Sequence, residues 1–273
     1  MSGLASTVIV NNGQIKGIET KTGGRFDYDY LVLAPGREGT DWLSTEAKRL
    51  NLTMHNNPIN VGIRVELPVA VMEGLTDVLY EVKLEFLLKS FDDRIETFCM
   101  CPAGEVIMES TGSTHLVITV NGHSYADRRS SNTYFALLVS TTFTELFQEP
   151  IAYGKCLARL ANILSGGVLV QPTLKSATPG DLSFVIPYPH LIEIIEMLQA
   201  MDKLAPGVSS HHTLLYEVKV KFYSCRPQLS PSLETEISNM FIAGDGAGIS
   251  RGLIETSASG VVATREILRR NGH

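Results

Sequence analysis

The chain has 273 residues, of which 44% are hydrophobic and 19% are charged, and its formal net charge is -6. This composition is that of a globular protein and excludes a disordered chain, while the negative charge argues against nucleic-acid binding, which needs clustered Lys and Arg. No apolar run approaches the roughly 20 residues of a membrane span, and neither a signal-peptide pattern nor a disulfide framework is visible, so we expect a cytoplasmic protein with no membrane partner.

The first fifty residues predict a small β-meander that leads into one buried strand. Asn11-Asn12-Gly13 and Thr22-Gly23-Gly24 are turn sequences between short runs of β-forming residues. Residues 31–34 are continuously apolar, as a strand buried in a parallel sheet should be. The predicted elements are strands at 7–10, 15–19, 26–28 and 30–34, a turn at Pro35-Gly36, and a helix that Thr40 or Asp41 caps and that runs to about Leu50.

No nucleotide-binding loop is found before this meander. A dinucleotide fold begins with a strand, a glycine-rich turn and a helix, and this pattern does not occur ahead of Thr7. We therefore expect either that the chain is a fragment of a longer protein or that another polypeptide supplies the missing half.

The middle of the chain, from about residue 59 to 226, predicts a mixed region. Its strands are indicated by β-branched and aromatic residues, and the second of its helices by Leu191, Ile194 and Leu198 at helical spacing. We predict strands at 59–66, 79–84, 97–101, 106–108, 115–120 and 213–221, helices at 151–164 and 190–204, and a linker at 226–232.

The last segment has the pattern strand, glycine-rich turn, helix. A strand at 240–243 precedes Gly244-Asp245-Gly246-Ala247-Gly248, and a helix follows from about residue 252 to 269, with Ile254, Ala258, Val261, Val262 and Leu268 on one face. Glycines allow a ligand to approach the backbone, and the N–H groups at the helix start carry partial positive charge. A flavin fits, with its ribityl hydroxyls on Asp245 and its pyrimidine edge at the helix N-terminus. The alternative is a plain glycine turn.

Longer motifs strengthen the flavin interpretation. The segment 241–248, followed by Arg251-Gly252, Ala258, Gly260 and Ala263, resembles the closing FAD motif of two-dinucleotide-binding-domain flavoproteins. The ordered motifs at 61–66, 98–104 and 120–128 resemble those of the uncharacterised FAD-dependent dehydrogenase family, often called NAD(FAD)-utilising dehydrogenases. The family's opening Gly-x-Gly-x-x-Gly region is absent here. Asp245 stands where the family often has Glu, Arg251 replaces a small residue, and Ala103 replaces a common glycine.

The resemblance implies a fold and a cofactor. It implies an α/β fold of mixed α+β character: an incomplete FAD-binding domain at residues 1–58 and 227–273, with an inserted mixed substrate domain at residues 59–226. Leu33-Ala34-Pro35-Gly36 is similar to the family's second FAD-contacting strand end. The residues implied to bind FAD are Ala34, Pro35, Gly36, Gly244, Asp245, Gly246, Ala247, Gly248, Arg251, Gly252 and Leu253.

Five residues of the middle region are candidates for catalysis. His123, Tyr125 and Arg128 could bind an anionic substrate, with His123 or Tyr125 as proton donor, or could belong to a solvated loop. Cys99 and Cys101 could pack beside the flavin or substrate or form a redox dithiol, and we predict no metal site because a second cysteine pair is absent.

The role of Arg64 and Glu66, and the choice among three possible functions, are left open by the sequence. Arg64 and Glu66, on one strand face, are either a structural ion pair or substrate contacts. The chain is part of an FAD-dependent oxidoreductase, a truncated non-catalytic paralogue or binding module without flavin, or an enzyme that uses flavin in non-redox chemistry. For the first function we expect a small-molecule substrate and NAD(P)H or another electron donor as partners. Lacking a phosphate-binding loop, the isolated chain is expected to bind FAD weakly or not at all.

Overall fold

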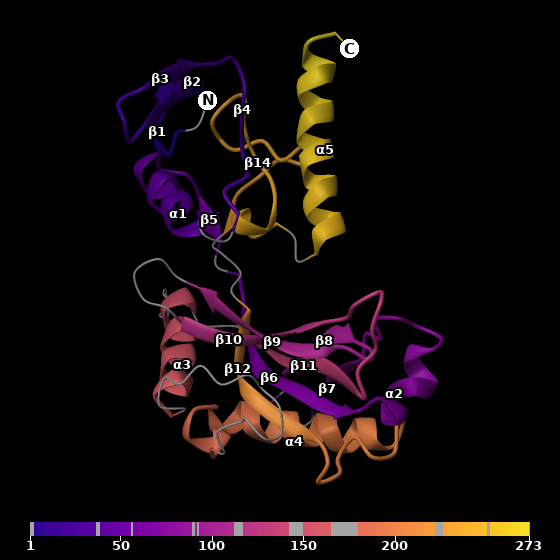
Figure 1. The fold of residues 1–273 in the computed structure, drawn as a ribbon. Coiled ribbons are helices and arrows are strands. Elements are labelled where there is room, and N and C mark those ends of the chain that lie inside the picture. Colours follow the sequence, from indigo (N-terminus) through magenta and orange to yellow (C-terminus); the bar gives the residue numbers. More distant parts are fainter. Residues whose placement is uncertain are drawn as a thin grey trace. The chain divides into compact units, whose positions relative to one another are not determined.

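The computed structural model describes residues 3–36, 39–55, 57–88, 91, 93–111, 117–141, 150–164, 180–221, 226–249 and 252–272. The chain divides into two compact units, here called unit 1 (residues 1–57 and 223–273) and unit 2 (residues 58–222). Both units mix helices and strands, which confirms the expected mixed α/β class (Figure 1). Among the described helices, none is long and apolar enough to cross a lipid bilayer.

Unit 1 combines a three-stranded antiparallel meander with a pair of parallel strands. The meander has the strand order β1-β2-β3, and Asn12 and Gly13 turn between its first two strands with φ angles of 49° and 72°. Asn and Gly adopt positive φ at little cost, which allows this tight hairpin. The elements of unit 1 are β1 (Ala5–Asn11), β2 (Gln14–Thr20), β3 (Arg25–Asp27), β4 (Leu31–Leu33), α1 (Thr40–Arg49), β5 (Met54–His55), β13 (Arg226–Pro227), β14 (Met240–Ile242), the 3₁₀ turn η2 (Asp245–Ala247) and α5 (Leu253–Arg270).

The parallel pair lies at the centre of the unit 1 core. Strand β14 pairs with β4 so that Ile242 is opposite Leu33, and all three residues of β14 are fully buried. The same apolar cluster contains Ile15 of the meander and Leu43 of α1. Because the two strands run in the same direction, the residues that follow each of them come together at one edge of the pair.

Helix α5 packs through its small residues rather than its large apolar ones. Ser259 and Ala263 are buried, whereas Ile254 is 83% exposed and Val261 is 50% exposed. The exposed residues lie seven positions apart and therefore share a face of the helix, as the sequence indicates, but that face is not buried. The buried face of the helix thus consists of small side chains, one of which, the Ser259 hydroxyl, accepts a hydrogen bond from Gly244 after β14.

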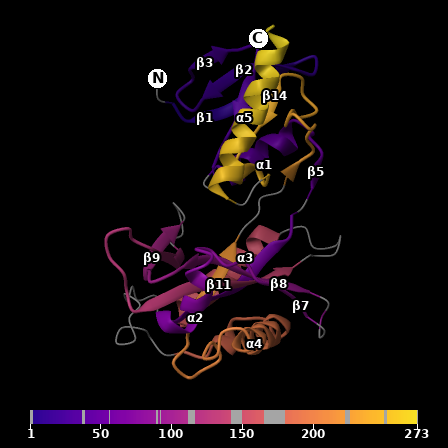
Figure 2. The same cartoon turned by 90° about the vertical axis from the view of Figure 1, so that its right-hand side faces the viewer.

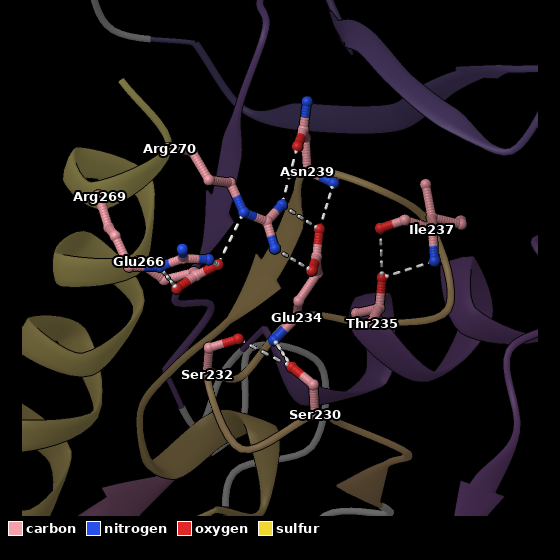
Figure 3. Close-up of polar contacts among 9 residues, drawn as sticks. All are labelled: Ser230, Ser232, Glu234, Thr235, Ile237, Asn239, Glu266, Arg269 and Arg270. Atoms are coloured by element: carbon pink, nitrogen blue, oxygen red, sulfur yellow. Dashed lines mark hydrogen bonds and ion pairs between the residues drawn. The ribbon is translucent and has the colours of Figure 1, made fainter. Parts of the chain in front are cut away.

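The last turn of α5 is tied to the segment before β14 by an ionic network (Figure 3). The Arg270 guanidinium donates to the two carboxylate oxygens of Glu234 at 2.7 and 2.5 Å and to the side-chain oxygen of Asn239 at 3.1 Å. The backbone N–H of Asn239 also donates to Glu234, at 2.7 Å. Hydrogen bonds from Arg270 lower the pKa of Glu234. The network holds the C-terminal end of α5 against the segment that leads into β14.

Unit 2 is built on a five-stranded antiparallel sheet of order β12-β6-β11-β8-β7. Helix α4 runs along one face of this sheet in both views (Figures 1 and 2). A separate hairpin, β9–β10, is joined by antiparallel pairing from Thr111↔Val117 to Glu105↔His123. The elements are β6 (Ile59–Pro68), α2 (Val69–Thr76), β7 (Glu85–Leu87), β8 (Arg94–Cys101), β9 (Glu105–Thr111), β10 (Val117–His123), β11 (Asn132–Thr141), α3 (Pro150–Leu164), the 3₁₀ turn η1 (Leu182–Phe184), α4 (Tyr188–Asp202) and β12 (Leu214–Lys221).

Alternation along β6 gives this sheet one apolar and one polar face. Ile63 and Val65 belong to the core cluster that also contains Ile194 of α4. Arg64 and Glu66, which alternate with them, point to the opposite face and are nevertheless buried. Unit 2 therefore buries charged groups within its sheet, and these groups need partners.

Some predicted elements of the middle region are wrong. Residues 79–84 do not form a strand, and the short strand β7 begins only at Glu85. The ten-residue strand β11 pairs with both β6 and β8, and neither it nor helix α2 was predicted. Both elements contain continuous apolar runs, and such a run lacks the alternation of apolar and polar residues that distinguishes a strand from a helix in sequence. The predicted linker at 226–232 begins with strand β13, which pairs with β5.

The close pairing of β6 and β11 predicts that Gly62 cannot be replaced. A Cβ at this position would lie 1.7 Å from the carbonyl oxygen of Leu137, so Gly62→Ala should force the strands apart and destabilise unit 2 by about 2–3 kcal/mol. Gly74→Ala is the control, because a Cβ at Gly74 meets nothing within 4 Å, and it should stabilise α2 by up to about 1 kcal/mol. Urea unfolding of the two variants checks this, and equal midpoints would contradict it.

Candidate functional site

Two glycine turns meet at the carboxyl edge of the β4–β14 pair. Gly36 follows β4 with a φ of 63°, and Gly244 follows β14 with a φ of 90°. A Cβ on Gly246 would lie 1.8 Å from the carbonyl oxygen of Gly36, so the two turns touch only because position 246 has no side chain. The Thr40 hydroxyl, at the start of α1, donates to the carbonyl oxygen of Gly246 at 3.3 Å.

Helix α5 holds the second turn in place. The N–H of Gly244 donates to the Ser259 hydroxyl at 2.9 Å, and this hydroxyl donates to the carbonyl oxygen of Thr256 at 2.6 Å. Gly248 ends the turn in the left-handed region, and its carbonyl oxygen accepts from the Asn57 amide at 3.1 Å. The shape of this edge therefore depends on backbone and small side chains.

The residues at this edge fit a flavin. The glycine turns form a backbone surface without side chains, and Asp245, half-buried between them, supplies a carboxylate that can accept hydrogen bonds from hydroxyl groups. Helix α5 begins after Gly252, and the carboxylate of Glu255 lies so close to Gly252 that a Cβ there would meet it at 2.1 Å. The Glu255 carboxylate thus lies at the N-terminus of α5, where the helix dipole is positive.

The structure brings most of the expected cofactor residues together. Ala34, Pro35 and Gly36 follow β4, and the 244–248 turn follows β14, so the parallel register places both groups at one edge. Arg251 lies outside the described residues, as does the side chain of Leu253.

In unit 2, Arg64 links the strand that carries the cysteines to the β9–β10 hairpin. The guanidinium, which is fully buried, donates to the carbonyl oxygen of Cys99 at 3.2 Å and to the side-chain oxygen of Asn121 at 2.7 Å. Cys99 has a φ of 46°, and the pairing of β8 with β11 shifts register beside it. Arg64 therefore holds an irregular stretch of β8 in place.

Glu66 is the centre of a second buried network. Its carboxylate accepts hydrogen bonds from the hydroxyls of Tyr134, at 3.0 Å, and Tyr216, and from the amide of Asn132. These donors come from β11 and β12, the two strands that flank β6. Burial, together with the adjacent Glu66 carboxylate, raises the pKa of both tyrosines well above its usual range, so both hydroxyls stay protonated and donate. Arg64 and Glu66 were expected to form either a structural ion pair or substrate contacts. The hydrogen bonds described above go to separate partners for each residue, so they support a structural role for both but not an ion pair between them.

The candidate catalytic residues form two neighbouring groups. The His123 and Tyr125 rings are stacked with centroids 6.5 Å apart, and the Arg128 guanidinium lies 4.1 Å from the Tyr125 centroid. All three are exposed, and Arg128 also pairs with Glu105 at 2.6 Å. An incoming anion would have to compete with this carboxylate for Arg128.

The cysteines lie beside that group. The Cys101 thiol is 3.5 Å from the carbonyl oxygen of Cys99, and burial raises the pKa of Cys101 although Arg64 opposes the shift. Cys99, Cys101 and Cys156 are free thiols, and Cys225 lies outside the described residues. Within the described part of the chain, no group of three or more His, Cys, Asp or Glu residues could hold a metal ion.

Sequence reasoning missed the partners of the buried charges. Asn121, Asn132, Tyr134 and Tyr216 come from three different strands, and their contacts depend on strand pairing that the sequence does not reveal. One signal was available, since strict alternation of polar and β-branched residues along β6 indicates a strand with two different faces.

Comparisons with known proteins point to FAD. Residues 58–162, which begin with the first residue of unit 2, match the family model described as "FAD-dependent protein, C-terminal domain-like". An "Uncharacterized protein" of Clostridium beijerinckii is 22% identical, over 96% of this chain and 56% of its own length. FAD is the cofactor that this family match and the glycine edge of unit 1 support.

Solved structures resemble the chain weakly. Iminodiacetate oxidase from Chelativorans sp. BNC1 is 12% identical, with a TM-score of 0.35 over 96% of this chain and 48% of its own. A protein described as an FAD-containing monooxygenase, from Photorhabdus luminescens, is 10% identical, with a TM-score of 0.36 over 96% and 55%. The chain spans about half the length of the proteins it matches.

The Glu66 network predicts a large effect from one hydroxyl. Tyr216→Phe removes a hydrogen bond to a buried carboxylate and should destabilise unit 2 by about 1.5–3 kcal/mol. Tyr188→Phe is the control, because Tyr188 is 69% exposed, and it should change stability by less than about 0.5 kcal/mol. Thermal unfolding followed by circular dichroism measures both, and a Tyr216→Phe protein as stable as the control would disprove a role for this bond.

Proposed function

We propose that the full-length protein is an FAD-dependent oxidoreductase, in which unit 1 binds the ribityl and ring portion of the flavin and unit 2 serves as the substrate domain. The observation that carries the proposal is the contact between the Gly36 and Gly246 turns at the carboxyl edge of two parallel strands. Ligands of open parallel sheets bind at this edge, because the loops that follow the strands diverge there.

Each residue of the edge has a role in this proposal. Asp245 accepts hydrogen bonds from the ribityl hydroxyls, and the glycines on both sides of it let the ring approach the backbone. Backbone N–H groups of the first turn of α5 are proposed to face the pyrimidine edge and to stabilise its negative charge once the Glu255 carboxylate, which lies beside Gly252, turns away from the helix end. When bound, the flavin supplies the exchange of hydride or electrons with a substrate.

The proposed substrate contacts come from the exposed residues of unit 2 that were described as candidate catalytic residues. His123 and Tyr125 are the proposed proton donors, and Arg128 the proposed contact for an anionic small molecule. Cys99 and Cys101 are proposed to line the same region. NAD(P)H or another electron donor is the proposed second substrate, and dehydrogenation is the proposed reaction.

The assignment of Asp245 can be tested against that of Cys99. In the full-length protein, Asp245→Ala should weaken FAD binding by about 10- to 100-fold, because a charge-assisted hydrogen bond contributes about 1.5–3 kcal/mol. Cys99→Ser should retain the cofactor and change turnover instead, since it lies in unit 2. The FAD retained after gel filtration is the measurement. Equal retention, or a greater loss with Cys99→Ser, would show that the ribityl contact is assigned to the wrong residue.

The glycine contact gives an independent test of the proposed function. Gly246→Ala should abolish FAD binding, because its Cβ would collide with the carbonyl oxygen of Gly36 and separate the two turns. Gly260→Ala is the matched control in α5, since a Cβ there meets nothing within 4 Å, and it should bind FAD as the unmodified protein does. Visible absorbance of the purified proteins reports bound flavin. A yellow Gly246→Ala protein with normal FAD content would refute this site.

A further inference from the structure

Two ionisable side chains lie in the apolar interface between α4 and the sheet of unit 2. His190 is 5% exposed and Glu193 is 0% exposed. They are three positions apart on the helix and therefore share its buried face, which Ile194 and Met197 complete. Burying a charge in such an interface is costly unless it is paired, so the protonation states of these two residues bear on how α4 is held.

His190 is placed as a neutral imidazole. Its Nε2 atom lies 2.8 Å from the hydroxyl oxygen of Thr141 on β11, and its Nδ1 atom meets no hydrogen-bond partner among the described residues. A charged imidazolium would carry an unsatisfied N–H in this position. Burial lowers the pKa of His190, and the Asp93 carboxylate opposes this shift only in part.

Glu193 is placed as the protonated partner of a carboxyl pair. Neither of its oxygens accepts a hydrogen bond from a donor in the described part of the chain. The charged groups that act on it are also acidic: Asp93, in the segment before β8, and Glu196 on α4 itself. Burial, followed by the Asp93 carboxylate, raises the pKa of Glu193 to about 8. With no donor in reach, the ionised carboxylate would stay unsatisfied, whereas a protonated carboxyl could donate to the nearby Asp93.

We propose that α4 is a pH-sensitive latch, docked on the sheet while His190 is neutral and Glu193 shares its proton with Asp93, and loosened when Glu193 ionises. The latch borders a cavity of about 740 Å³, because Leu191, Ile194 and Ile195 of α4 line it opposite Ile63 of the sheet. Loosening α4 therefore changes the shape of this cavity.

The pKa directions define the pH range in which the latch acts. The contribution of Glu193 is complete below its ordinary pKa of 4.5 and is lost as pH rises through about 8. The contribution of His190 is complete above its ordinary pKa of 6.5 and is lost as pH falls through its lowered value. Between 4.5 and 6.5 the two slopes oppose each other, whereas above 6.5 Glu193 acts alone. The opening constant of α4 should rise almost tenfold over the first pH unit there, and about 15-fold in all by pH 8, where half of Glu193 is already ionised in the docked state.

Hydrogen exchange of the full chain tests the latch. Exchange of peptides covering α4 is measured at pH 6.5 and pH 8, with exposure times scaled to the intrinsic amide exchange rates. The unmodified protein should show the rise of about 15-fold in the opening constant of α4. Glu193→Gln, whose neutral amide can still donate to Asp93, should show no rise. Glu196→Gln is the comparison variant on the same helix: it removes the weakest of the negative charges that act on Glu193 and should keep most of the rise.

Other outcomes would overturn the proposal. An equal rise in Glu193→Gln, or no rise in the unmodified protein, would remove Glu193 as the titrating group. Asp93→Asn is a second variant that keeps the test valid if Glu193→Gln folds poorly. It takes away the neighbouring negative charge and should make the rise smaller. An unchanged rise in Asp93→Asn would exclude the shared proton.

Discussion

Unit 1 depends on the contact between two turns that have no side chains at the point where they meet. Gly246 rests against the carbonyl oxygen of Gly36, and this is possible because β4 and β14 are parallel and end at the same level. The core cluster behind the contact contains Ala247 of the second turn and Leu33 of the first strand, so core packing and edge geometry are coupled. A ligand at this edge would meet backbone that lies directly against the core cluster.

Unit 2 is organised by a different constraint, the burial of polar groups on both faces of one sheet. On one face, Arg64 and Glu66 are paired with neutral partners from neighbouring strands. On the other face, His190 and Glu193 lie among aliphatic side chains with fewer partners. A buried charge is tolerated where hydrogen bonds are available and is replaced by a neutral form where they are not. The first face is therefore fixed and the second depends on pH.

The support for FAD comes from two different parts of the chain. The family match covers residues 58–162 of unit 2, whereas the glycine edge that fits the flavin belongs to unit 1. The two observations are independent, since one concerns sequence in the middle of the chain and the other backbone geometry near its ends. Both observations support FAD as the cofactor.

The sequence by itself determined the local elements and the chemistry at their ends. The Asn12-Gly13 hairpin, the apolar strand that starts at Leu31 and the Gly244–Gly248 turn follow from backbone preferences within a few residues of each position. Tertiary structure decided what depends on pairing between distant segments. Strand β11 had no periodic signal of its own, and the contact of Tyr216 with Glu66 spans 150 residues. The exposed apolar face of α5 and the burial of Glu193 on α4 could not be predicted for the same reason. Helical periodicity shows which residues share a face of a helix, but not whether that face is buried.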